Sequence, residues 1–127
     1  MEFTTQISTT QEQSKRLLAL GLKRETADCV IMYYDGWHIG EAEHFDFDKD
    51  PVEPAWSLHR LLAMLTYQVI YNDAKYEPVI ALDGMAYQDV CTNDPVIGWS
   101  GDLYTDVIDC IEWLISQEQF NPDYLKG

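Results

Sequence analysis

Three aspartates at alternate positions form the pattern in this sequence that comes nearest to a metal site. Asp46, Asp48 and Asp50 stand at positions 1, 3 and 5 of a calcium loop of the EF-hand type. Such a loop needs glycine at position 6 and a bidentate glutamate at position 12, where this chain has Pro51 and Ser57. Because half of the ligand set is missing, we expect a solvated acidic loop and no metal or other cofactor. The three aspartates are weak candidates for a divalent cation.

Motifs for nucleophilic or histidine-based catalysis are absent from the sequence. His38, His44 and His59 lack the spacing of zinc-binding motifs, and no cysteine stands near a histidine. Neither a Gly-x-Ser-x-Gly elbow nor a glycine-rich phosphate loop occurs. Paired carboxylates carry little information among 22 acidic residues. We lean toward a protein without catalytic residues, and a small enzyme or ligand-binding domain with a site assembled across the sheet is the alternative.

The last predicted helix carries an acidic arc opposite to its apolar face. Asp102, Asp106, Asp109 and Glu112 make up this arc, which we expect to face water, and Trp113 lies near it. Tryptophan is enriched at interface hot spots, so these five residues are the candidates for an interaction surface. Packing of Trp113 against a neighbouring loop or the tail of the chain is the interpretation that we favour for that residue alone.

Acidic residues dominate the chain, but not uniformly. The formal net charge is −14, from eight basic and 22 acidic residues. Residues 1–24 have a net charge of +2, and the remaining 103 residues have a net charge of −16. Such a charge disfavours direct binding of nucleic acid or an anionic membrane and suits a basic protein partner. A second interpretation is that the acidic helix face imitates the phosphates of a duplex, as in a DNA mimic.

The elements that must position these residues follow from apolar periodicity and turn signals. We expect one α+β domain over residues 1–127, with an antiparallel sheet of four to five strands and three helices in the order α-β-β-α-β-β-(β)-α. The predicted helices are 8–21, 55–65 and 101–118, the strands are 29–34, 37–43, 67–71, 77–82 and 86–91, and the loops are 44–54 and 92–100.

Several local features are predicted within these elements. Thr9 and Glu12 fit a capping box, and Ser100 is the expected N-cap of the last helix. Asp35-Gly36 indicates a hairpin turn, after which Trp37 and Ile39 share one face of the returning strand. The three cysteines lie in apolar surroundings and are expected to be buried and reduced: Cys29, Cys91 and Cys110.

Segments in order along most of the chain resemble small uncharacterised proteins of phages and mobile elements of gut Bacteroidales. The segments are Leu20-Gly-Leu22, Thr26-Ala-Asp28, Pro54-Ala-Trp-Ser-Leu-His-Arg-Leu-Leu62, Cys110-Ile-Glu-Trp-Leu114 and the tail 121–125. A proline expected after the second helix is replaced here by Thr66. The resemblance implies a phage or mobile-element origin and a shared fold, and it implies no site residue.

These observations together predict a non-enzymatic, acidic protein-interaction domain that modulates a host protein. The longest apolar runs are too short to span a bilayer, and the N-terminus lacks the basic and apolar regions of a signal peptide. We therefore expect a cytoplasmic protein whose partner is an unidentified protein of basic character, with no membrane and no nucleic acid bound directly.

Overall fold

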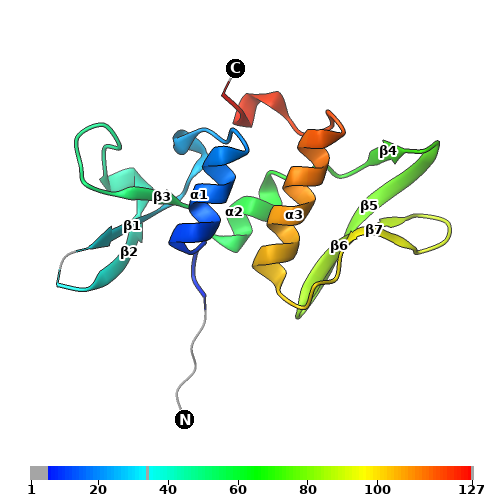
Figure 1. Ribbon diagram of the computed structural model, residues 1–127, viewed down its shortest axis with the longest axis horizontal. Helices are drawn as coiled ribbons and strands as arrows, with labels where there is room; N and C mark the ends of the chain where they lie inside the picture. Colours follow the sequence, from blue (N-terminus) through cyan, green and yellow to red (C-terminus); the bar gives the residue numbers. More distant parts are fainter. Residues whose placement is uncertain (1–5, 34, 127) are drawn as a thin grey trace, which may run out of the picture. The chain divides into compact units, whose positions relative to one another are not determined.

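The computed structural model describes residues 6–33 and 35–126, and the chain divides into two compact units. Unit 1 comprises residues 1–61 and 124–127, and unit 2 comprises residues 62–123. The predicted α+β class is confirmed, with antiparallel strands and three α-helices among the described residues. The strands form two sheets, of three and four strands, where one sheet was expected (Figure 1). The expectation of a single domain stays a prediction.

Unit 1 contains the three-stranded sheet, drawn in cyan and green in Figure 1, in the order β2-β1-β3. Its turn at Asp35 and Gly36 has φ of 51° and 116°, the left-handed values that a tight hairpin of this kind requires, so the predicted hairpin is confirmed. The elements are α1 (Gln11–Ala19), η1 (Arg24–Thr26), β1 (Cys29–Tyr33), β2 (Trp37–Glu41), η2 (Ala42–His44) and β3 (Glu53–Ala55). Helix α2 (Leu58–Ala63) includes the point of division.

The capping box of α1 lies one residue later than predicted. Thr10 is the N-cap and exchanges hydrogen bonds with Gln13, where Thr9 and Glu12 were expected. Thr9 is buried, and its hydroxyl oxygen accepts a hydrogen bond from the backbone N–H of Trp56 at 3.1 Å. A tertiary contact therefore takes the hydroxyl that the local pattern assigned to the helix end.

Strand β3 was not expected, because two prolines bound the segment that contains it. Pro54 lies opposite Val30 in an edge strand, where a residue without a backbone N–H is tolerated. Since β3 occupies residues 53–55, α2 begins only at Leu58, three residues later than predicted.

Trp56 organises the buried interior of unit 1. Its side chain is completely buried, and its indole N–H donates to the hydroxyl of Thr26 at 2.9 Å. The backbone oxygen of Trp56 accepts from the N–H of Thr9 at 2.8 Å, so the buried polar groups in this region are hydrogen-bonded. Fully buried apolar residues complete the core: Leu17, Leu22, Val30, Ala55 and Leu61.

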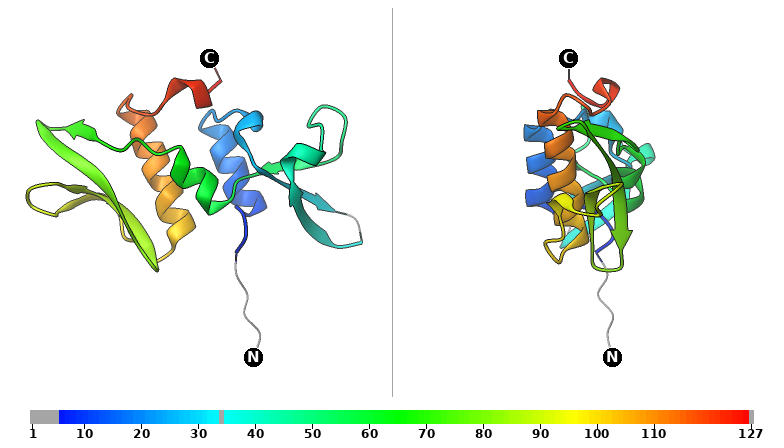
Figure 2. Two further views of the ribbon diagram at one scale, coloured as in Figure 1. Left: turned by 180° about the vertical axis from the view of Figure 1, so that it is seen from behind. Right: turned by 90° about the vertical axis from the view of Figure 1, so that its right-hand side faces the viewer.

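Unit 2 contains the four-stranded antiparallel sheet, in the order β4-β5-β6-β7, and α3 packs against β6 and β7 (Figure 2). The predicted apolar face of α3 is buried at Val107, Ile108, Ile111 and Leu114. The elements are β4 (Val69–Tyr71), β5 (Ala74–Ala81), β6 (Gly84–Asp89), β7 (Pro95–Gly98) and α3 (Leu103–Ser116). The short helix η3 (Pro122–Tyr124) includes the second point of division.

Two predictions for unit 2 were wrong in detail. β7 occupies part of the predicted loop 92–100. A strand is possible there because its proline, Pro95, stands at the first position of an edge strand. Gly98, the last residue of the strand, has a φ of 117°. The N-cap of α3 is Asp102, whose carboxylate accepts a hydrogen bond from the N–H of Thr105 at 3.1 Å, in place of Ser100.

Candidate functional site

The acidic arc predicted on α3 does not face water as a whole. Asp106 is completely buried, and its two carboxylate oxygens accept hydrogen bonds from the backbone N–H groups of Met85 at 3.1 Å and Ser100 at 2.8 Å. Asp102 is exposed but serves as the N-cap. Asp109 is half-buried, which leaves Glu112 as the one member of the arc that is exposed and outside the cap.

Trp113 packs on the sheet of unit 2. Its ring lies 5.5 Å from the rings of Tyr71 and Tyr87 and 6.3 Å from that of Tyr76, measured between centroids. The residues Asp106, Cys110 and Trp113 are spaced i, i+4 and i+7, which places them on one flank of α3. The position of Asp106 and Trp113 on the same flank as the cysteine was the sequence signal that these two residues face the sheet.

The carboxylates of the 46–50 loop make contacts that stabilise the loop. Asp46 accepts from the backbone N–H of Asp48 at 2.8 Å, and Asp50 accepts from that of Asp46 at 2.7 Å. Asp48 forms an ion pair with Arg24 at 2.8 Å, and the Arg24 guanidinium lies 5.7 Å from the centroid of the Phe47 ring. These contacts account for the alternation of acidic and aromatic residues in the loop.

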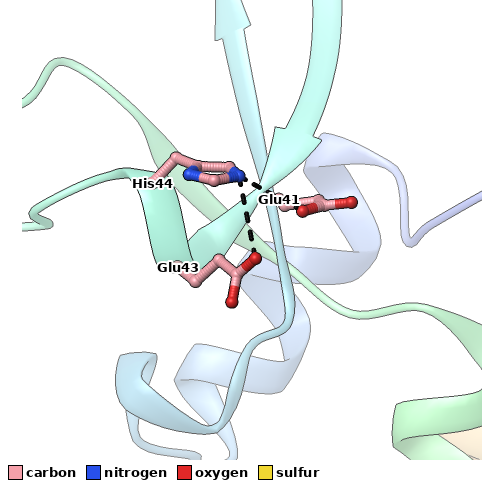
Figure 3. Close-up of side chains that lie close together, drawn as sticks. All are labelled: Glu41, Glu43 and His44. Carbon is pink, nitrogen blue, oxygen red and sulfur yellow. Dashed lines mark ion pairs between the residues drawn. The ribbon is translucent and has the colours of Figure 1, made fainter.

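Another group of possible ligands lies at the end of β2. Within residues 6–33 and 35–126, Glu41, Glu43 and His44 are the one set of three whose ligand atoms lie within 4.8 Å of one another. The Nε2 atom of His44 is 3.3 Å from a carboxylate oxygen of Glu41 and 3.7 Å from one of Glu43 (Figure 3). All three side chains are exposed, so the group is accounted for as a surface ion pair. His38 and His59 are also exposed and stand apart from this group.

An acidic recess of about 610 Å³ lies beside this group in unit 1. Four carboxylates line it, those of Glu25, Asp28, Glu41 and Glu43. Burial, and secondarily the neighbouring Asp28, raises the pKa of the Cys29 thiol in the recess to about 11. The thiol is therefore protonated at neutral pH, and the recess offers negative charge without a thiolate nucleophile.

An apolar groove of about 390 Å³ lies over the other end of β2. Ile31, Trp37 and Ile39 line it together with the segment 6–11. The exposed fractions of Trp37 and Ile39 are 62% and 49%, and the ring of Tyr33 packs edge-on against that of Trp37 at 5.1 Å. The sequence placed Trp37 and Ile39 on one face of a strand but gave no indication that this face is open.

The recess and the groove adjoin the same strand and form what we call the β2 surface, defined by Trp37, Ile39 and Glu41 of β2 and the residues that line the two hollows. Side chains alternate along a strand, so these three residues point to one face. The register agrees, because Ile31 of the groove is paired with Ile39, and Cys29 of the recess is paired with Glu41. An open apolar patch is thus followed by concentrated negative charge along five residues of chain.

Comparisons of the chain with protein-family models, with curated proteins and with solved structures gave no match. No helix in the described part of the chain combines the length and the apolar character needed to cross a membrane.

Proposed function

We propose that this protein is a non-enzymatic, acidic protein-interaction domain of phage or mobile-element origin, which binds and modulates a basic host protein through the β2 surface. The observation that carries the proposal is the succession of the apolar groove and the acidic recess along β2. Protein interfaces have an apolar centre with aromatic anchors, which a polar rim surrounds.

Trp37 is the anchor of this surface. Its side chain is 62% exposed, although it could bury far more apolar area than most residues. Ile39 and Tyr33 flank it, with exposed fractions of 49% and 68%. Exposed apolar side chains that lie together, and not singly, are characteristic of interaction sites.

The charge of the whole chain supports a basic partner. Unit 2 contains eleven acidic residues and a single basic residue, Lys75, so its formal net charge is −10. Unit 1 contains eleven acidic and seven basic residues, for a net charge of −4. A field of this sign accelerates the encounter with a positively charged protein and slows the encounter with nucleic acid.

Affinity capture from a lysate of a gut Bacteroidales host tests the proposal, with the full chain immobilised and bound proteins identified by mass spectrometry at low and high salt. Wild-type protein is expected to retain a basic protein at low salt and to release it at high salt. The variant Trp37→Ala is expected to lose the same protein.

The matched control is Leu82→Ala, which removes a fully exposed apolar side chain of unit 2. This variant should retain the partner like wild type. Capture of no basic protein at either salt, or equal capture by Trp37→Ala and wild type, would contradict the proposed function.

A further inference from the structure

We infer that β2 is a docking strand, to which an extended segment of the basic partner adds as an antiparallel fourth strand. The apolar side chains of this segment lie over the groove, and a lysine or arginine enters the recess. The inference rests on the proposed function and specifies how the β2 surface is occupied. It starts from the fact that β2 is an edge of its sheet, where backbone groups can pair with another chain.

The other edge strands of the described sheets carry features that oppose such pairing. β3 contains Pro54 and β7 begins with Pro95, and a proline cannot donate a ladder hydrogen bond. The edge of β4 is covered by Gln119, which accepts from the N–H of Ile70 at 3.0 Å and donates to its backbone oxygen at 2.6 Å. One side-chain amide thus occupies both backbone groups that another strand would use.

β2 is longer than these three strands, and unlike β3 and β7 it contains no proline. Its sequence is Trp-His-Ile-Gly-Glu. Gly40 is kept free of a side chain by packing, since a Cβ atom there would lie 2.8 Å from Met32 and 3.1 Å from Phe45. The strand therefore combines an extended backbone with the exposed side chains of Trp37 and Ile39.

The spacing of the two hollows defines the sequence that fits them. In an antiparallel pair, side chains directly opposite lie on the same face, with about 5 Å between their Cβ atoms. The added strand runs antiparallel to β2. From its N- to its C-terminus, its residues therefore lie opposite Glu41, then Ile39, then Trp37. The segment that fits is therefore Lys-x-Val-x-Val, in which Val represents any β-branched or apolar residue.

A second copy of this chain fits the surface less well. Each copy has a formal net charge of −14, so self-association brings like charges together. The recess also needs a cation, because its four carboxylates are Glu25, Asp28, Glu41 and Glu43. Charge complementarity thus selects a basic segment.

Two synthetic peptides of identical composition test the inference. One is acetyl-Ser-Lys-Thr-Val-Thr-Val-Thr-amide, and the other is its reverse, acetyl-Thr-Val-Thr-Val-Thr-Lys-Ser-amide. Each is titrated into the ¹⁵N-labelled full chain and followed by amide chemical shifts. The first peptide is expected to shift the amides of β2 and the indole N–H of Trp37, and to bind about tenfold more tightly than its reverse.

Protein variants separate the two parts of the surface. Trp37→Ala is expected to weaken binding of the first peptide by about tenfold. The double variant Glu41→Gln with Glu43→Gln is expected to weaken binding and to reduce its salt dependence. The matched control Glu77→Gln, on β5 of unit 2, is expected to change neither.

N-methylation of the peptide backbone distinguishes strand pairing from side-chain recognition. In an added strand, alternate amides face β2 and solvent. Methylation of the amides that face β2 should abolish binding. Methylation of the amides that face solvent should leave the affinity within about twofold of that of the unmethylated peptide. Equal binding of both methylated peptides, tighter binding of the reversed peptide, or unshifted β2 amides at millimolar peptide would each overturn the inference. If Trp37-dependent capture from lysate persists in those cases, the proposed function stands and only the docking mode is wrong.

Discussion

On the flank of α3 that faces β6, one carboxylate connects three segments of unit 2. Asp106 accepts hydrogen bonds from Met85 at the start of β6 and from Ser100 in the connection to α3. Gly84 leaves the room for it, since a Cβ atom there would lie 2.7 Å from the Asp106 carboxylate. The sequence presented Asp106 as one of four similar acids on a helix, and only the fold distinguishes it from the others.

Replacement of Asp106 by alanine is expected to lower the free energy of unfolding by about 2–4 kcal/mol. The buried N–H of Met85 and the part-buried N–H of Ser100 would be left without their acceptor, and an unsatisfied buried donor costs roughly 1–3 kcal/mol. Urea denaturation followed by tryptophan fluorescence measures the change. The control Glu112→Ala, exposed on the same helix, should stay within about 0.5 kcal/mol of wild type. Equal effects of the two substitutions would contradict the role given to Asp106.

The expectation that all three cysteines are buried was wrong. Cys110 is buried, Cys29 is half-buried, and Cys91 is exposed after the end of β6. Burial, and secondarily the carboxylates of Asp106 and Asp109, raises the pKa of the Cys110 thiol from 9.0 to about 12. An apolar neighbourhood in the sequence therefore did not predict burial at the end of a strand.

Iodoacetamide at pH 8 is expected to alkylate Cys91 in the native protein and to leave Cys110 unmodified, as peptide mass spectrometry would show. Alkylation of Cys110 and Cys91 at equal rates without unfolding would contradict the burial of Cys110.

The raised pKa of Cys110 also predicts a pH dependence of stability. Its contribution to the free energy of unfolding is present in full below pH 9, where the thiol is protonated in both the folded and the unfolded state. This contribution is lost as the pH rises toward 12.

At the scale of elements, strong periodicity and turn residues predicted most of the fold. The apolar stripe of α3 and the Asp-Gly turn of the first hairpin carry their signal within a few residues, so both were found. The short strands β3 and β7 were missed because each contains a proline, and β3 is in addition defined by its pairing with the distant strand β1. The same limit applies to the candidate site, since exposure of Trp37 is a property of the fold and not of its neighbours in the sequence.

The N-cap of α3 offers a test at this scale, because sequence and structure assign it to different residues. Asp102→Ala is expected to lower the free energy of unfolding by about 1 kcal/mol, since its carboxylate accepts from the N–H of Thr105. Ser100→Ala is expected to cost less, because the Ser100 hydroxyl oxygen accepts only a longer hydrogen bond, from the N–H of Asp102 at 3.3 Å. Denaturant unfolding of both variants decides between the assignments, and a larger effect at Ser100 would restore the assignment made from sequence.

For the molecule as a whole, the unequal charge of the two units is the dominant physical property. Unit 2 contains eleven acidic residues and a single lysine, so repulsion among the carboxylates opposes its compact state. Sequence composition revealed the charge, but its division between two units became visible only with the fold.

Stability is therefore expected to increase with ionic strength. Between about 10 and 200 mM NaCl the Debye length falls from about 30 Å to less than 10 Å, which screens the repulsion among the carboxylates. The midpoint of urea unfolding at pH 7 should rise over this range. A midpoint that falls or stays constant would show that the acidic residues are already neutralised by pairing within the fold.

Hydrogen exchange of the full chain, with and without the protein captured from the host lysate, shows directly whether the partner binds at the β2 surface. Amide protection resolved by residue shows where the partner lies. Binding at the β2 surface predicts increased protection over β2, Trp37–Glu41, and around the groove and the recess, with little change on α3. Protection gained on the exposed face of α3 around Glu112, with β2 unchanged, would contradict it.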